Sequence, residues 1–197
     1  MLSRIGLALL APVALAAAQR PSLVSIVTDD QGRWAMGAYG NAEIRTPHID
    51  RMAAEGMKFT DFYVAASVCS PSRAALLTGC YPNRVGIAGA LGPRAKHGIH
   101  EDEVTLAELC KSRGYATACI GKWHLGLGDG VTPVDWNGDV KPGPLEVGFD
   151  YSFLLPSTND RVPCVYLENH RVGNLDPKDP LFVGKKPEGV KCTEYPD

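Results

Sequence analysis

The stretch TLAELCKSRGYATACIGKWH, residues 105–124, decides the expected fold. Thr105 and Glu108 have the spacing of a capping box, and the apolar residues at 106, 109 and 110 form the expected buried face of a short helix. Gly114 stands where a glycine commonly ends a helix. The run from Ala116 to Ile120 then has the apolar character of a buried strand. A helix followed directly by a buried strand predicts a layered β/α protein.

The same alternation is expected upstream of this stretch. Residues 23–28, LVSIVT, are apolar and β-branched, as in a central strand of a parallel sheet. A helix is expected from Pro47, a second strand over residues 57–65 and a further short helix that begins at Ser70 and ends near Gly79. We therefore expect an α/β fold with a largely parallel central sheet and helices on both of its faces.

The composition is that of a folded globular chain without a basic excess. The 197 residues hold 20 Lys and Arg against 22 Asp and Glu, for a formal charge of −2, and 45% of them are hydrophobic. The balance of charge argues against a nucleic-acid binder and against a polybasic membrane-surface protein. The hydrophobic fraction excludes a disordered chain.

The first 18 residues have the features of a secretory signal peptide. Arg4 precedes an apolar run, and Ala16 and Ala18 are small residues suited to a cleavage site. The run is shorter than the about 20 residues of a membrane span, and an uncleaved anchor is the alternative. We therefore expect a secreted or periplasmic protein with no stable membrane span after cleavage.

The mature part, residues 19–197, retains all six cysteines, and none of them has CxxC spacing. A zinc ribbon is therefore not favoured, while a disulfide between Cys164 and Cys192 is conceivable but not deducible. Residues 127–197 are rich in Gly and Pro, and only Tyr151–Leu155 suggests another buried strand there. This region is expected to be a loop-rich tail.

Two pairs of polar residues directly follow expected strands. Asp29 and Asp30 follow the strand 23–28, and Lys122 and His124 follow the strand that ends at Ile120. Parallel sheets bind ligands beyond the carboxyl ends of their strands, so both pairs are expected at one rim. Two adjacent carboxylates favour a hard divalent cation such as Ca²⁺ or Mg²⁺. Taken alone, an Asp-Asp pair is more often part of a turn, and a single histidine is more often structural.

A further group of candidate residues lies at the start of the helix expected from Ser70. Cys69 stands just before a helix whose expected first position is Pro71, at the positive end of the helix dipole, where an anion is favoured. Arg73, one turn into the helix, offers a planar set of donors suited to a tetrahedral oxyanion. On these residues alone, a buried structural cysteine is the alternative.

Two of these segments resemble sulfatase signatures. Residues 67–79, SVCSPSRAALLTG, match the Cys-x-Pro-Ser-Arg form of the first signature, and residues 114–124, GYATACIGKWH, resemble the second. Together with Asp29-Asp30, the resemblance to the N-terminal part of the formylglycine-dependent arylsulfatase-type sulfatases extends over residues 22–126, and less clearly to about residue 160. It implies an alkaline-phosphatase-like fold and a chain that is the front part of a longer enzyme.

The resemblance implies the nucleophile and the metal site. Cys69 matches the position that a formylglycine-generating maturation enzyme oxidises to an aldehyde, whose hydrate supplies a nucleophilic hydroxyl. Asp29, Asp30 and the modified Cys69 match ligands of a divalent cation, usually Ca²⁺ and less often Mg²⁺. The family's second pair of metal ligands, another lysine and another histidine are expected beyond this chain.

The resemblance also implies the remaining roles in catalysis. Arg73 matches the residue that holds the hydrate, Lys122 one that contacts the sulfate group, and His124 one that orients and deprotonates the hydrate. The expected activity is release of inorganic sulfate from a sulfated carbohydrate or an aryl sulfate. The alternatives are a phosphatase or phosphodiesterase of the same superfamily, and a non-catalytic fragment or pseudoenzyme that binds sulfated ligands.

Overall fold

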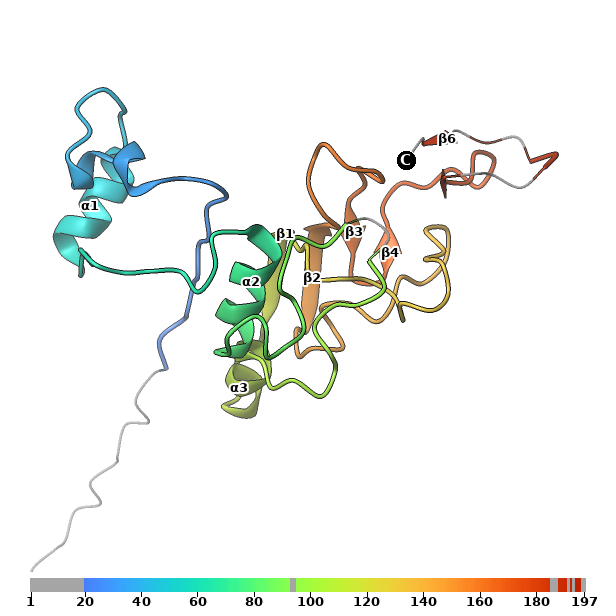
Figure 1. Cartoon of the computed structure of the whole chain (residues 1–197), viewed down its shortest axis with the longest axis horizontal. Coiled ribbons are helices and arrows are strands. Elements are labelled where there is room, and N and C mark those ends of the chain that lie inside the picture. The colour runs from blue at the N-terminus through green and yellow to red at the C-terminus, as the bar shows by residue number, and fades with distance from the viewer. Residues whose placement is uncertain (1–19, 93–94, 185–187, 191, 193, 196–197) are drawn as a thin grey trace, which may run out of the picture. The chain divides into compact units, whose positions relative to one another are not determined.

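The computed structural model describes residues 20–92, 95–184, 188–190, 192 and 194–195 (Figure 1). The expected signal peptide, residues 1–18, lies outside the described residues. The chain divides after Met57 into two compact units. Each unit is described by itself below.

The first unit is a small helical cluster. It contains the 3₁₀ helices η1 (Arg33–Ala35) and η2 (Gly37–Tyr39) and the helix α1 (Pro47–Glu55). The carboxylate of Asp50, in the first turn of α1, accepts hydrogen bonds from the Ala38 amide at 2.6 Å and the Thr46 hydroxyl at 3.0 Å. α1 begins at Pro47 as expected because proline suits the first turn of a helix.

Two of the expected strands are absent from the structure. Residues 23–28 and 57–65 form no strand, and the large apolar side chains within them are exposed, up to 82% for Val24 and 83% for Tyr63. A strand is stabilised by a hydrogen-bonded neighbour, and neither segment belongs to a sheet of the described residues. An apolar β-branched run alone did not determine these elements, and both strand predictions were wrong.

The second unit contains a four-stranded sheet in the order β1-β2-β3-β4. Its strands are β1 (Ala118–Lys122), β2 (Tyr151–Leu155), β3 (Leu167–Glu168) and β4 (Arg171–Val172). β1 and β2 are parallel, with Ala118 opposite Tyr151, whereas β2-β3 and β3-β4 are antiparallel. The α/β class is confirmed, but the described sheet is mixed rather than largely parallel.

The antiparallel strands that make the sheet mixed lie in the Gly- and Pro-rich tail. β2 was predicted with its observed bounds, but β3 and β4 are two residues long, which is too short for a pattern of alternating burial. The tail also contains a parallel pair, β5 (Phe182–Val183) and β6 (Glu194–Tyr195). The tail therefore contains more regular structure than its composition suggests.

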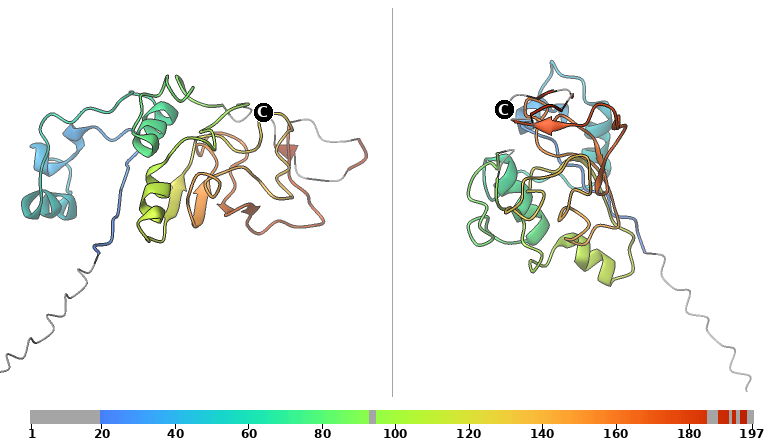
Figure 2. Two further views of the ribbon diagram at one scale, coloured as in Figure 1. Left: turned by 90° about the horizontal axis from the view of Figure 1, so that it is seen from below. Right: turned by 90° about the vertical axis from the view of Figure 1, so that its right-hand side faces the viewer.

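The helices α2 (Cys69–Thr78) and α3 (Leu106–Ser112) contact each other in the second unit, and both lie near β1 (Figures 1 and 2). α2 ends at Gly79, whose positive φ of 66° favours glycine. The predicted capping box of α3 is present, and the Thr105 hydroxyl also donates to the Val147 carbonyl at 2.7 Å. None of the helices that the structure describes is both long enough and apolar enough to span a membrane.

The core of the second unit is built from loops together with residues of α2, β2, β3 and β4. Along β2, Ser152 and Leu154 are buried while Tyr151 and Phe153 are more exposed. Not every expected buried face is buried, because on α3 the side chain that faces inward is Ala107, whereas Leu106 and Leu109 are 43% and 51% exposed. The completely buried aliphatic side chains include Ile87, Leu125, Val140, Leu154 and Leu167.

We expect Thr105→Ala to lower the free energy of unfolding by about 1–2 kcal/mol, because it removes the cap of α3 and leaves the buried Val147 carbonyl without its donor. Urea denaturation of the purified chain measures the change. Thr105→Ser keeps the hydroxyl and should lose much less stability. Equal denaturation midpoints for Thr105→Ala and the parent chain would contradict this account.

Candidate active site

Cys69 is the first residue of α2 and is half-buried. The helix begins two residues before Pro71, which was expected at its first position. Its first intrahelical hydrogen bond runs from the Ser72 amide to the Val68 carbonyl at 3.0 Å, so the amides of Cys69 and Ser70 precede the hydrogen-bonded ladder. Cys69 therefore lies at the helix end where the dipole favours negative charge.

The neighbouring Ser70 attaches the start of α2 to another loop. Its side chain is completely buried, and its Oγ accepts a hydrogen bond from the Leu91 amide at 3.0 Å. A buried hydroxyl with a partner holds its backbone in one place at little energetic cost. The hydrogen bond of Ser70 therefore helps to fix the start of α2, where Cys69 lies.

Arg73 connects α2 to the end of β1. Its Nη1 donates to the backbone carbonyl of Lys122 at 2.8 Å, across 49 residues of sequence. The side chains of Arg73 and Lys122 are both half-buried. The structure thus brings the two signature segments together, one of them through a side chain and the other through its backbone.

His124 is almost completely buried, with 2% of its surface exposed. Its backbone has a positive φ of 57°, and its amide donates to the Pro156 carbonyl at 3.0 Å. Its Nε2 lies 2.7 Å from the Leu91 carbonyl oxygen, whereas its Nδ1 has no hydrogen-bond partner among the described residues. A carbonyl only accepts, so Nε2 carries the hydrogen and Nδ1 keeps its lone pair.

The surroundings of His124 favour the neutral ring. Burial lowers its pKa below the ordinary value of a histidine, and the charges of Lys122, Arg161 and Arg73 lower the pKa further, against an opposing effect of the Leu91 hydrogen bond. Because the pKa is lowered, the imidazole stays unprotonated to a lower pH than a free histidine. A buried neutral imidazole with a free Nδ1 can accept a proton from a nearby hydroxyl.

Lys122 and His124 would point to the same side only if strand geometry continued past residue 122. β1 ends at Lys122, and His124 has left-handed backbone geometry, so the alternation of a strand does not apply to the pair. Between them Trp123 belongs to the core and donates from Nε1 to the Gly126 carbonyl at 2.6 Å. The charge of Lys122 nevertheless acts on the imidazole.

Three contributors to this site were missed in the sequence. They are Ser70, Leu91 and Arg161, whose Nη1 donates to the Leu91 carbonyl at 3.3 Å. Leu91 acts only through its backbone, which leaves no signature in the residue type. Arg161 lies in the loop-rich tail, 70 residues from its partner, and no local pattern connects the two.

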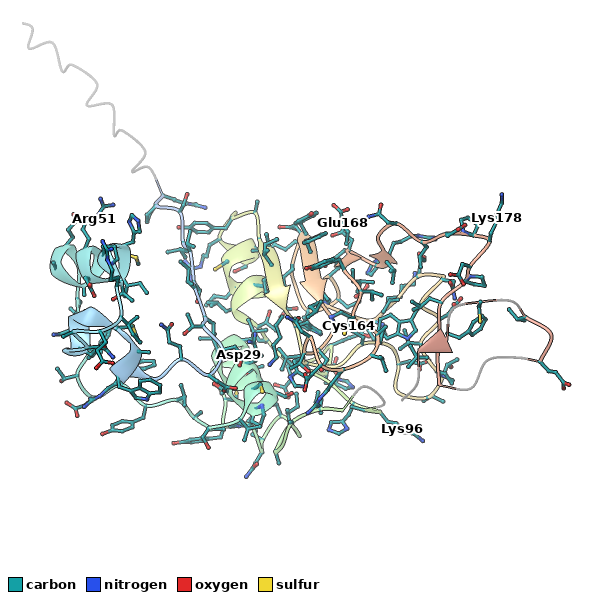
Figure 3. All side chains as sticks on the ribbon, turned by 90° about the horizontal axis from the view of Figure 1, so that it is seen from above. Asp29, Arg51, Lys96, Cys164, Glu168 and Lys178 are labelled. Carbon is teal, nitrogen blue, oxygen red and sulfur yellow. The ribbon has the colours of Figure 1, made fainter. Side chains whose placement is uncertain are left out.

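The expected metal ligands Asp29 and Asp30 belong to the first unit, whereas Cys69 belongs to the second. Both carboxylates are exposed, and Asp29 is labelled in Figure 3. Two adjacent accessible carboxylates are hard oxygen donors of the kind that Ca²⁺ and Mg²⁺ prefer. In the described parts of the chain, no group of three or more His, Cys, Asp or Glu side chains could hold a metal ion. The pair is therefore a suitable but partial set of ligands.

A small cavity borders the imidazole. It has a volume of about 40 Å³ and is lined by His124 together with residues of the loops around Leu91 and Ser157. This space can hold roughly one water molecule and is too small for a sugar. The binding region for a substrate is therefore not this cavity.

Comparison with known proteins agrees with the two signature segments. The sequence model of the family described as Sulfatase matches residues 21–171. An N-acetylgalactosamine-6-O-sulfatase from Bacteroides thetaiotaomicron is 45% identical over 166 residues, which cover 84% of this chain and 32% of that protein. Arylsulfatase A from Bos taurus is 44% identical over 151 residues, which cover 76% of this chain and 28% of that protein.

Solved structures give the same result. A Bacteroides thetaiotaomicron structure from work on the metabolism of multiple glycosaminoglycans matches with a TM-score of 0.73 and 45% identity, over 77% of this chain and 32% of that one. Ps i-CgsB in complex with k-i-k-neocarrahexaose matches with a TM-score of 0.57 and 35% identity, over 66% of this chain and 27% of that one. These likenesses confirm the alkaline-phosphatase-like α/β fold.

The chain spans about a third of the length of these relatives. The family match covers residues 21–171, and it includes the helix with Cys69 and Arg73 and the segment with Lys122 and His124. The chain belongs to the sulfatase family.

Proposed function

We propose that this chain provides the nucleophile and part of the anion-binding site of a sulfuric ester hydrolase. The observation that most supports this function is the hydrogen bond between Arg73 and the Lys122 carbonyl, which joins the two signature segments beside a neutral His124. The guanidinium of Arg73 in the first turns of α2 and the lysine at the end of β1, together with an imidazole nitrogen that keeps its lone pair, suit a reaction on a tetrahedral anion.

A sulfated glycan is the substrate class that we favour over an aryl sulfate. One relative is an N-acetylgalactosamine-6-O-sulfatase, and a similar structure contains k-i-k-neocarrahexaose. The resemblance to arylsulfatase A keeps an aryl sulfate as the second candidate. In either case the product is inorganic sulfate.

The nucleophile is proposed to derive from Cys69. Sulfatases generally depend on a formylglycine, and Cys69 stands in the Cys-x-Pro-Ser-Arg sequence in which that residue forms. The hydrate of the aldehyde would supply a hydroxyl that attacks sulfur. The chain therefore needs a formylglycine-generating maturation enzyme as a partner, and a secreted or periplasmic location fits the sequence of residues 1–18.

The other described residues of the site have separate roles in the proposed reaction. Arg73, anchored on the Lys122 carbonyl, presents a fixed positive charge near the start of α2, where it can hold a hydroxyl or a sulfate oxygen. The Lys122 ammonium adds a second charge for the sulfate group. Nδ1 of His124 accepts the proton of a hydroxyl, since Nε2 is occupied by Leu91.

A divalent cation is proposed to complete the anion site. Asp29, Asp30 and the modified Cys69 would hold it, and their oxygen chemistry favours Ca²⁺ over a softer metal. When bound, the cation would neutralise charge on the sulfate oxygens. Further ligands are required, because Ca²⁺ takes about 6–8 oxygens.

We expect mass spectrometry of the peptide that contains Cys69 to show replacement of sulfur and two hydrogens by one oxygen. The chain would be secreted from cells that contain a formylglycine-generating enzyme, and a known sulfatase would be matured in parallel as the control. An unmodified thiol at Cys69, when the control is converted, would exclude the proposed nucleophile.

Cys69→Ala should reduce sulfate release by more than about 10³-fold, because it removes the nucleophile. Ion chromatography of sulfate released from sulfated N-acetylgalactosamine measures the rate of the matured protein. Cys110→Ala, which changes a half-buried cysteine of α3, is the matched control and should keep the parent rate. Equal rates for Cys69→Ala and Cys110→Ala would contradict the proposed nucleophile, whereas no sulfate release by the matured parent protein would favour the non-catalytic alternative.

The imidazole of His124 should titrate below the ordinary value of about 6.5, since burial and three neighbouring cations oppose its protonation. NMR titration of the ring protons measures this midpoint, and His124→Gln identifies the signal by its loss. The acidic limb of the pH profile of kcat/KM, which reports the free enzyme, should follow the same midpoint. A titration midpoint of His124 at or above 6.5 would contradict the prediction that the buried ring stays neutral below the ordinary pKa of histidine.

A further inference from the structure

The peptide group of Leu91 is the common partner of three side chains. Its carbonyl oxygen accepts from His124 Nε2 at 2.7 Å and from Arg161 Nη1 at 3.3 Å, and its amide donates to Ser70 Oγ at 3.0 Å. Leu91 itself is only 5% exposed. The start of α2, the imidazole and the tail therefore meet at one buried peptide.

The tail contacts the backbone of His124 and, separately, the carbonyl that accepts the hydrogen bond of its ring. The Pro156 carbonyl accepts the His124 amide at 3.0 Å, and Arg161 reaches the carbonyl that the ring itself uses. The segment between Pro156 and Arg161 thus fixes the backbone of His124 at one end and the acceptor of its side chain at the other. The shared carbonyl can serve both donors because a carbonyl oxygen has two lone pairs.

The two donors to this carbonyl differ in one respect. A neutral imidazole can exchange its hydrogen between Nε2 and Nδ1, whereas a guanidinium only donates and stays protonated at all relevant pH values. The position of the Leu91 carbonyl is therefore held by Arg161 whatever the ring does. With the carbonyl in place, the hydrogen on Nε2 has an acceptor, while a hydrogen on buried Nδ1 would find none among the described residues.

We propose that Arg161 is a positioning residue for His124, which holds the Leu91 carbonyl against Nε2 and thereby leaves Nδ1 as the atom that can accept a proton. The use of Nδ1 in catalysis rests on the proposed function, but the assignment of the tautomer does not. The proposed role of Arg161 requires no contact with the nucleophile or with sulfate. Arg161 acts through the Leu91 carbonyl.

The charge of Arg161 acts in the same direction. Together with Lys122 and Arg73, it opposes a second proton on the imidazole. The three cations come from different parts of the second unit, namely the end of β1, the first turns of α2 and the tail. Arg161 also contacts the carbonyl that accepts the hydrogen bond of the ring.

The test is the tautomer of His124, measured by ¹⁵N NMR of the imidazole nitrogens in the full chain at neutral pH. The parent chain should show one protonated nitrogen, Nε2, and one unprotonated nitrogen, Nδ1. In Arg161→Met the two resonances should move toward each other as both tautomers become populated. Arg161→Lys, which restores a positive donor, should recover most of the parental pattern.

Arg171→Met is the matched control, since Arg171 is also in the tail but forms its ion pair with Asp139, at 2.7 Å. It should leave both resonances unchanged. A parental pattern in a folded Arg161→Met chain would overturn the proposal. Unfolding of both Arg161→Met and Arg161→Lys would overturn it as well, because Arg161 would then support the fold rather than the tautomer. The NMR measurement does not require sulfate release, so its result is independent of whether Cys69 provides the nucleophile.

Discussion

The hydrogen bond from Arg73 to the Lys122 carbonyl is the interaction on which the candidate site depends. It joins a helix that begins at Cys69 to a strand that begins 49 residues later. A hydrogen bond from a charged donor contributes about 1.5–3 kcal/mol, and at a half-buried position it is less weakened by solvent than at the surface. The acceptor is a backbone oxygen, so this hydrogen bond does not use the side chain of Lys122.

Directly after this bond the chain leaves strand geometry. Gly121, within β1, and His124, two residues after its end, both have positive φ, and the imidazole of His124 is buried in the interior. Positive φ is uncommon for residues other than glycine, although histidine tolerates it better than most. The hydrogen bonds of the His124 amide to Pro156 and of its ring to Leu91 offset this cost. The tail is thus part of the site rather than an appendage.

Structural features that depend on neighbouring residues were predicted correctly from the sequence, whereas features that depend on distant contacts were not. The capping box at Thr105 and the glycine that ends α2 depend on neighbouring residues, and both appear in the structure as expected. The segment 23–28 has the composition of a central strand, but strand formation depends on a partner that composition does not specify. Likewise the signature residues could be found in the sequence, whereas Arg161 and Leu91 could not, because their contact spans 70 residues and uses a backbone atom.

The positive charges around His124 have two effects that support each other. Arg73 and Lys122 are suited to hold sulfate oxygens, and the same charges lower the pKa of the imidazole and keep it unprotonated. An anion bound to these cations would offset their charge and raise the pKa of His124 toward its ordinary value. A higher pKa makes Nδ1 a stronger base. The ring would therefore be unprotonated before the substrate binds and would gain proton affinity when the anion is in place.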